Sequence, residues 1–144
     1  MHPMIDLQAV KNVIALGLPA SPGAVTGKIV FTPEEVQKAK DQGDQVILVR
    51  VETTAEDIHG MQAALGILTT SGGMTSHAAL LARGMGRTCI VGCKGLSVDE
   101  KKQRLILEDG SVIRKGRLLT LDGSSGEVME GGCPPSMPMR IRII

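Results

Sequence analysis

The strongest constraint on the fold is the alternation of short apolar runs and short helix signals in the middle of the chain. Residues 46–51 form an almost uninterrupted β-branched run, the pattern of a central strand that is buried on both faces. A capping threonine, a proline and a glutamate open a predicted helix at Thr32, which ends at Gly43. Thr53 or Thr54 can cap a second short helix. This alternation predicts a mixed α/β fold.

Both ends of the chain are instead rich in predicted strands. The stretch 17–23, with two prolines and two glycines, predicts a loop between the first two strands. The segment 75–84 predicts a two-turn helix, because it has a hydroxyl cap, good helix formers, a basic last turn and a terminal glycine. The expected strands cover residues 13–16, 24–31, 46–51, 66–70, 88–91, 105–107, 111–113 and 117–121.

Composition limits the chain to one domain with an aliphatic core. It has 144 residues, and Phe31 is its single aromatic residue, so Val, Ile, Leu, Ala and Met must fill the interior. With a net charge of +1 and no Trp or Tyr for base stacking, nucleic acid is not an expected partner. No apolar run approaches the roughly 18 residues of a membrane span, and the sequence starts without a leader pattern. We therefore expect a cytoplasmic protein without a membrane partner.

The three cysteines argue against a disulfide framework and against zinc. Cys89, Cys93 and Cys133 are odd in number and irregular in spacing. Cys89 and Cys93 lie four residues apart on what we expect to be the same face of a strand, which fits either a metal or redox pair or ordinary packing. Packing of reduced thiols in the core is the preferred interpretation.

The stretch 69–77 carries the candidate chemistry. A strand ends there, Gly72 and Gly73 turn the backbone, and a helix opens with His77 in its first turn. Glycines let amides approach an anion closely, and a helix start offers free N–H groups and a partial positive charge. The stretch therefore predicts a binding site for a phosphoryl group. The positive helix end also disfavours a second proton on the His77 ring, which leaves a neutral imidazole able to attack phosphorus.

Neighbouring polar residues can assist such a site. We expect Thr75 and Ser76 to hold a ring nitrogen or a phosphate oxygen, and Arg83 to reach phosphate oxygens if the chain folds back. The sequence lacks both G-x-x-x-x-G-K-[ST] and G-x-G-x-x-G, so the phosphoryl group must come from elsewhere. The spacing of these residues is also compatible with an ordinary strand–loop–helix turn that has a partly exposed histidine and no function. His59 is expected to have a surface or capping role.

The longer string GGMTSHAALLAR, residues 72–83, resembles the phosphohistidine signature of the phosphoenolpyruvate-utilising enzymes. Within this family the sequence is similar to the pyruvate phosphate dikinases. Phosphoenolpyruvate synthase and enzyme I of the sugar phosphotransferase system share the core motif, but they usually have Arg where Met74 stands. The resemblance covers roughly residues 12–130 and includes the segments 18–24, 54–61, 66–70, 84–86 and 91–92.

The resemblance implies a compact swivelling β/β/α phosphohistidine domain over residues 1–130, with a linker or truncated tail at 131–144. His77 matches the histidine that shuttles a phosphoryl group between an ATP-grasp nucleotide-binding domain and a PEP/pyruvate barrel. The net reaction in such enzymes converts ATP, pyruvate and phosphate into AMP, phosphoenolpyruvate and diphosphate. The phosphate-positioning residues are then expected to be Gly72, Gly73, Thr75, Ser76 and Arg83.

The same resemblance implies partners outside the chain. We expect an excised or truncated central domain that binds no cofactor or metal itself, depends on Mg²⁺ in the missing flanking domains, and belongs to a homodimeric full-length enzyme. Plastid or glycosomal location fits the family as well as the cytoplasm. Thr75 matches the threonine that a regulatory protein phosphorylates in plant dikinases, where a dianion repels incoming phosphate. The alternative from another functional class is a non-catalytic docking module with the same fold.

Overall fold

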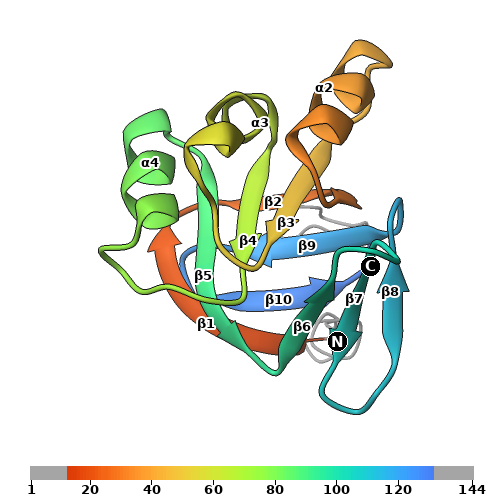
Figure 1. Ribbon diagram of the computed structural model, residues 1–144. Helices are drawn as coiled ribbons and strands as arrows, with labels where there is room; N and C mark the ends of the chain where they lie inside the picture. Colours follow the sequence, from red (N-terminus) through yellow and green to blue (C-terminus); the bar gives the residue numbers. More distant parts are fainter. Residues whose placement is uncertain (1–12, 132–144) are drawn as a thin grey trace, which may run out of the picture.

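The computed structural model describes residues 13–131, which form a mixed α/β structure around a closed seven-stranded barrel (Figure 1). The strands follow one another around the barrel in the order β1-β10-β9-β2-β3-β4-β5. Their bounds are β1 Val13–Ser21, β2 Ala24–Val30, β3 Val46–Arg50, β4 Gly66–Thr69, β5 Thr88–Lys94, β9 Leu118–Asp122 and β10 Glu127–Glu130. The α/β fold class expected from the sequence is confirmed.

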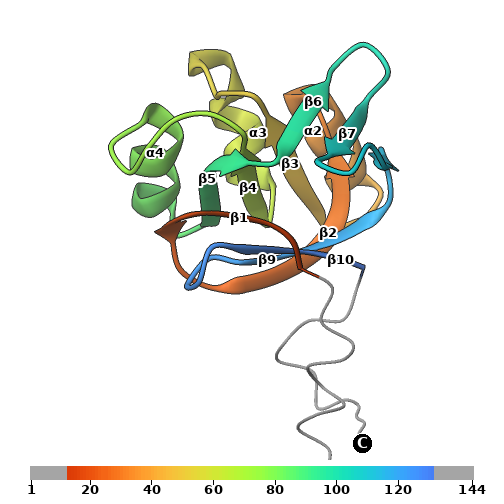
Figure 2. The same cartoon turned by 90° about the horizontal axis from the view of Figure 1, so that it is seen from below.

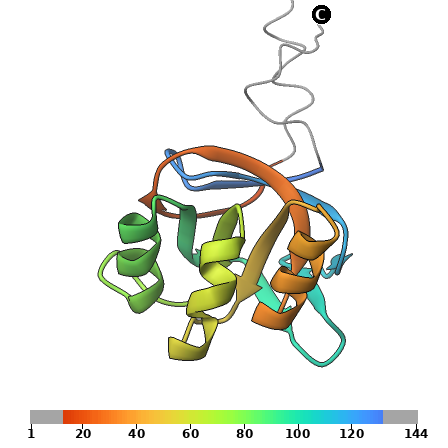
Figure 3. The same ribbon diagram turned by 90° about the horizontal axis from the view of Figure 1, so that it is seen from above.

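Four neighbouring strands are parallel, because a helical segment connects each one to the next. The pairs β2–β3, β3–β4 and β4–β5 are parallel, whereas β1, β9 and β10 are paired antiparallel. The connecting helices lie side by side over one side of the barrel (Figure 3). They are α2 (Pro33–Asp41), α3 (Ile58–Ala63), preceded by the 3-10 turn η1 (Ala55–Asp57), and α4 (His77–Met85). None of the helices within the described residues is long and apolar enough to span a bilayer.

Strand β3 separates two hydrophobic cores, as its uninterrupted apolar run predicts. Val46 and Leu48 face the core under the helices, whereas Ile47 and Val49 face the core inside the barrel. All four are buried. Phe31, the single aromatic residue, lies in the barrel core and is 1% exposed. The strand alternation of side chains therefore fills both layers with aliphatic groups.

The helix starts follow the sequence signals closely. Thr32 caps α2 in a capping box, in which its hydroxyl accepts from the Glu35 amide while the Glu35 carboxylate accepts from the Thr32 amide. Ser76 caps α4 by accepting from the Ala79 amide. Helix α4 continues past Gly84 to Met85 and is capped by Gly86, which has the left-handed conformation of a C-terminal cap, so the expected terminal glycine was two residues early.

The expected loop at residues 17–23 is wrong for residues 17–21, because β1 continues to Ser21, and only Pro22 and Gly23 separate it from β2. Strand β1 pairs with β10 at its start and with β5 from Leu16 onward, and its register shifts at three places, between Val13 and Ala15, between Leu16 and Leu18, and between Pro19 and Ser21. Such irregularities admit glycine and proline into a strand. Gly17 is required by packing, because a Cβ there would lie 2.5 Å from the Ile90 side chain.

Cys89 and Cys93 are buried free thiols, which confirms core packing, but they do not share a face. Cys89 packs under the helices and Cys93 inside the barrel. Between them Gly92 has a φ of +60°, which breaks the alternation of strand β5 and turns the second thiol inward. Burial raises the pKa of Cys89 to about 12 and that of Cys93 to about 11. Cys133 lies outside the described residues.

A second, three-stranded sheet covers one end of the barrel and is attached to α2. It consists of β6 (Leu96–Asp99), β7 (Arg104–Leu107) and β8 (Val112–Arg114), of which β6 was not expected from the sequence. Glu35 makes the attachment, because its carboxylate accepts from Gln103 at 2.7 Å and pairs with Lys115 at 2.5 Å. Burial raises the pKa of Glu35, but the bonds from Lys115, the Phe31 amide and Gln103 outweigh it, so the pKa lies below its ordinary value.

The described chain enters and leaves the barrel at one place. Val13, in the first strand, is paired with Met129 in the last, and these two strand ends lie together in the view from below (Figure 2). The expected boundary between a domain at 1–130 and a tail at 131–144 stays a prediction, because the described residues stop at Gly131.

We predict that Gly60→Ala lowers the free energy of unfolding by about 1–3 kcal/mol, because overpacking strains a buried contact. A Cβ at Gly60 would lie 2.8 Å from the Pro33 Cα, where α3 packs on α2. Gly84→Ala is the matched control, since its Cβ meets nothing within 4 Å. That change should leave stability unchanged or raise it by up to about 1 kcal/mol. Urea unfolding measures both, and equal effects at the two glycines would contradict the predicted packing.

We also predict that Glu35→Gln destabilises the fold by about 1 kcal/mol at pH 7, because the charge that binds Lys115 is lost. Since the folded pKa of Glu35 is lowered from 4.5, its contribution is complete above about pH 4.5 and disappears as the pH falls through the folded pKa. Urea midpoints of the two proteins should therefore converge in acid. Glu34→Gln, at the exposed neighbouring position, is the control. A difference that is independent of pH would contradict this assignment.

Candidate functional site

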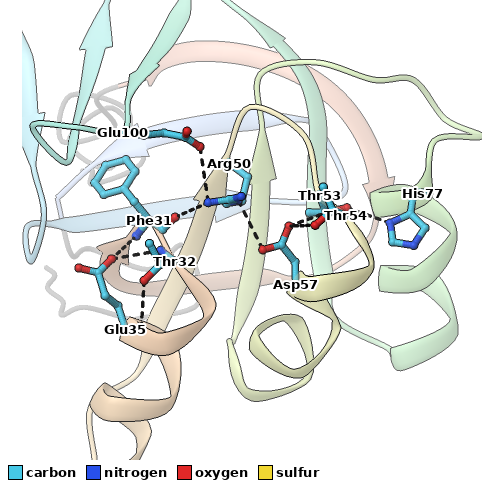
Figure 4. A network of polar contacts seen from close by, with 9 residues as sticks. All are labelled: Phe31, Thr32, Glu35, Arg50, Thr53, Thr54, Asp57, His77 and Glu100. Carbon is cyan, nitrogen blue, oxygen red and sulfur yellow. Dashed lines mark hydrogen bonds and ion pairs between the residues drawn. The ribbon is translucent and has the colours of Figure 1, made fainter.

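The candidate site lies where β3 and β4 end, the edge at which parallel sheets commonly bind ligands. The β3–β4 pairing places Arg50 opposite Thr69, so the two following loops start side by side. One loop leads to η1, and the other leads to His77, the first residue of α4. His77 is exposed, and Figure 4 shows its ring beside a network of polar contacts.

Hydrogen bonds hold the loop before His77 to three neighbouring segments. The Ser71 amide donates to Val51 O at 3.0 Å, and the Gly92 amide donates to Ser71 O at 3.2 Å. The Thr69 hydroxyl also donates to Ser71 O, at 2.7 Å. The loop therefore has fixed contacts with the end of β3 and with β5, and it presents the helix start from a defined position.

The two glycines of the motif have different roles. Gly72 has a φ of +95°, and a Cβ there would lie 3.0 Å from the Ser76 Cβ, so both its conformation and its packing favour glycine. Gly73 accepts a bond from the Ser76 amide at 3.0 Å, but a Cβ there would meet nothing within 4 Å. The space beside Gly73 is therefore open, in the loop that leads to the start of α4.

The hydroxyl groups of Thr75 and Ser76 are placed differently. The Ser76 hydroxyl accepts from the Ala79 amide at 3.4 Å and so caps the helix, whereas Thr75 is exposed. The expected contact of either group with a ring nitrogen of His77 is not among the bonds of the described residues. The ring nitrogen is bonded by another threonine, described next, and contact with a phosphate stays a prediction.

Thr53 is the residue that the sequence did not identify as part of the site. Its hydroxyl lies 3.3 Å from the His77 Nδ1 (Figure 4). Thr53 is 4% exposed. The two residues are 24 positions apart, and they meet because β3 and β4 are neighbours. With Nδ1 in this contact, Nε2 is left on the opposite side of the ring.

Arg83 folds back from the helix, as expected, but its contacts are with the backbone. Nη1 donates to Ala20 O at 3.0 Å, and Nη2 donates to Met74 O at 2.5 Å. The guanidinium therefore connects α4 to β1 and to the loop before His77. The expected contact with phosphate oxygens stays a prediction.

Behind Thr53 lies a charged network that the sequence did not reveal (Figure 4). Asp57 is 1% exposed, and its Oδ1 faces Arg50 Nε at 3.5 Å. Arg50 also donates to Phe31 O at 2.9 Å and faces Glu100 at 3.5 Å. Within residues 13–131 no three His, Cys, Asp or Glu side chains gather as a metal site would require.

We predict that Thr53→Val changes the tautomer of the His77 ring, because it removes the partner of Nδ1 while preserving side-chain shape. Nitrogen-15 NMR at about pH 9, where imidazoles are neutral, measures the fraction of rings with the proton on Nδ1. That fraction should fall in the variant. Thr75→Val, at the exposed neighbouring threonine, should leave it unchanged. The same fraction in wild type and Thr53→Val would show that the contact does not set the tautomer.

Comparison with known proteins identifies the family. The model of the "PEP-utilising enzyme, mobile domain" family matches residues 42–126, more than half of the chain. A pyruvate, phosphate dikinase of Rhizobium meliloti is 54% identical over 138 residues, which are 96% of this chain and 15% of that protein. Pyruvate, phosphate dikinase 2 of Zea mays is 49% identical over 140 residues, with 96% of this chain and 16% of that protein covered.

A solution structure of Enzyme I is also similar, with a TM-score of 0.42 and 24% identity over 62% of this chain and 32% of that one. The chain spans only about 15% of the length of the dikinases it matches. The identity over that segment confirms the resemblance expected from the sequence. With the family match over residues 42–126, the chain belongs to the PEP-utilising enzymes, as their mobile domain.

Proposed function

We propose that the chain is the phosphohistidine carrier domain of a pyruvate phosphate dikinase, with His77 as its covalent nucleophile. The observation that carries this proposal is the position of His77, an exposed residue at the start of α4. Thr53 contacts Nδ1 of its ring, and Nε2 takes no part in that contact. A proton on Nδ1, donated to the Thr53 oxygen, leaves a lone pair on Nε2. That nitrogen is therefore the atom that attacks phosphorus.

The reaction proceeds in three transfers. Nε2 of His77 attacks the β-phosphorus of ATP, a bond to Nε2 forms, and the bond from the β-phosphorus to the AMP oxygen breaks. An oxygen of inorganic phosphate then attacks the γ-phosphorus, which releases diphosphate and leaves one phosphoryl group on the ring. Finally the enolate oxygen of pyruvate, which has lost a methyl proton, takes that group as the bond to Nε2 breaks, giving phosphoenolpyruvate.

The surroundings of His77 suit a charged phosphoryl group. The start of a nine-residue helix supplies a partial positive charge, and the open space beside Gly73 gives phosphate oxygens access to the first-turn amides. Gly72, Gly73, Thr75 and Ser76 are thus proposed to position the phosphate. Arg83 contributes by holding the loop at Met74, and a direct phosphate contact from it is the weaker part of this assignment.

A carrier must present the same ring to two sites. Because the first and last described strands are paired at Val13 and Met129, the connections to neighbouring domains leave from one place, and the body of the domain can turn about it. We propose that the neighbours are an ATP-grasp domain and a PEP/pyruvate barrel that hold Mg²⁺, in a homodimeric cytoplasmic enzyme. The dikinases that the chain matches are several times longer and have room for such domains.

The dikinase branch is preferred to the synthase and to enzyme I. Relatives named as dikinases are about half identical to the chain over nearly its whole length. Met74, where the other branches usually have Arg, is 42% exposed beside the site and is consistent with this choice. Thr75, exposed and two residues from His77, is proposed as a regulatory phosphorylation site, because a second dianion there would repel the incoming phosphate.

Labelled ATP tests the carrier function. We predict that the chain, supplied with the two partner domains in separate polypeptides, gains acid-labile and alkali-stable label from ATP labelled at the β-phosphorus, and that His77→Ala abolishes this gain. Label at the γ-phosphorus should leave as diphosphate in the presence of phosphate. His59→Ala, at another exposed histidine, is the matched control and should be labelled normally.

The outcome separates the alternatives. Label on Ser or Thr, or equal labelling of His77→Ala, contradicts the carrier function. Transfer of γ-label to water instead of phosphate indicates the synthase branch, and label only from a small phosphocarrier protein indicates enzyme I. A chain that never gains label yet binds the partner domains is a docking module.

A further inference from the structure

We propose that Arg50 and Asp57 are positioning residues for His77: together they close the loop that carries Thr53 and thereby fix which ring nitrogen is free to take phosphorus. The proposal rests on the carrier function of His77 and extends it to the ion pair between the half-buried Arg50 and the buried Asp57, which reaches the histidine through the loop that carries Thr53. Figure 4 shows the chain of contacts from Arg50 through Asp57 and the two threonines to the ring.

The first step is the sensitivity of the Thr53 contact. Its length of 3.3 Å is at the long end for a hydrogen bond with a hydroxyl group, so a small outward displacement breaks it. Thr53 is 4% exposed, so its hydroxyl faces Nδ1 from a buried position. The position of the backbone at Thr53 decides whether Nδ1 has a partner.

The second step is the anchoring of the next residue by Asp57. The Thr54 amide donates to Asp57 Oδ2 at 2.7 Å, and the Thr54 hydroxyl contacts the same oxygen at 3.4 Å. In return the Asp57 amide donates to Thr54 O at 3.0 Å. Asp57 is 1% exposed, so this carboxylate has no alternative partners in solvent, and it fixes the backbone directly after Thr53.

The third step is the ion pair that joins the two ends of the loop. Arg50 is the last residue of β3 and Asp57 the last residue of η1, and Nε of the first faces Oδ1 of the second at 3.5 Å. Arg50 is itself held, because Nη1 donates to Phe31 O at 2.9 Å at the end of β2. Thr53 therefore lies in a loop that is closed by its own end residues and fastened to the sheet.

The fourth step is the shared origin of the two loops. Thr70, in the loop that leads to His77, donates its amide to Arg50 O at 3.2 Å, and Ser71 donates to Val51 O. The backbone of Arg50 thus positions the start of the histidine loop, while its side chain positions the end of the Thr53 loop. One residue of β3 sets the relative placement of Thr53 and the ring.

The test is the ring tautomer of His77 in the unphosphorylated 144-residue chain. In Asp57→Asn the fraction of rings protonated on Nδ1, measured by nitrogen-15 NMR at about pH 9, should fall. The rate at which potassium phosphoramidate phosphorylates Nε2 should fall by about tenfold, the lower end of the effect found for groups that orient metal-binding histidines. Arg50→Gln should act in the same direction, and the double variant should lose little more than either single one.

A matched variant separates positioning from general stability. Asp44→Asn removes a carboxylate from an ion pair with Lys28 at the other end of β3. It should keep the wild-type tautomer and rate. Should Asp57→Asn fail to fold, Arg50→Lys keeps a charge beside Asp57 but loses the planar guanidinium that reaches Phe31 O, and a smaller shift in the same direction is expected.

Folded variants at Arg50 and Asp57 with the wild-type Nδ1 fraction and rate overturn the proposal, as does an equal shift in Asp44→Asn. The tautomer is read without any phosphoryl transfer between domains. A wild-type chain that shows the predicted tautomer pattern but takes no label from ATP therefore refutes the carrier function and leaves the positioning role intact. The opposite result refutes the positioning role alone.

Discussion

The parallel pairing of β3 with β4 is the constraint on which the rest of the site depends. It places Arg50 opposite Thr69, so two loops that are unrelated in sequence begin as neighbours. Each strand is buried on both faces, and the hydrophobic packing of both cores resists any change of register. A slip of one residue would exchange the two faces of β3 and separate Thr53 from His77.

Glycine makes the close approach of the loops possible. Gly92 of β5 donates to Ser71 O, and a Cβ there would lie 2.5 Å from Gly72 O. The same glycine has the positive φ that sends Cys89 and Cys93 into different cores. One backbone irregularity therefore serves both the packing of β5 and the placement of the loop before His77.

Elements governed by local chemistry could be predicted from the sequence. The capping box at Thr32, the doubly buried strand β3 and the helix start at His77 depend on residues within a few positions of each other. The passage of β1 through Gly17 depends instead on pairing with a distant strand, and the contact between Thr53 and His77 spans 24 residues. No periodicity or motif encodes such long-range contacts, because they form only when the sheet has formed.

Helix α4 explains how an exposed ring can also be accurately placed. Its buried residues are Ala78, Ala79 and Ala82, each at most 3% exposed, and side chains this short let the helix axis lie close to the sheet. They have no rotamers to exchange, so their packing fixes the backbone under His77, together with the Ser76 cap and the Arg83 bonds. The ring can then face solvent without losing its position, since its remaining freedom is limited by the contact at Nδ1. A carrier that meets two different sites needs this combination, because neither partner can supply the orientation for the other.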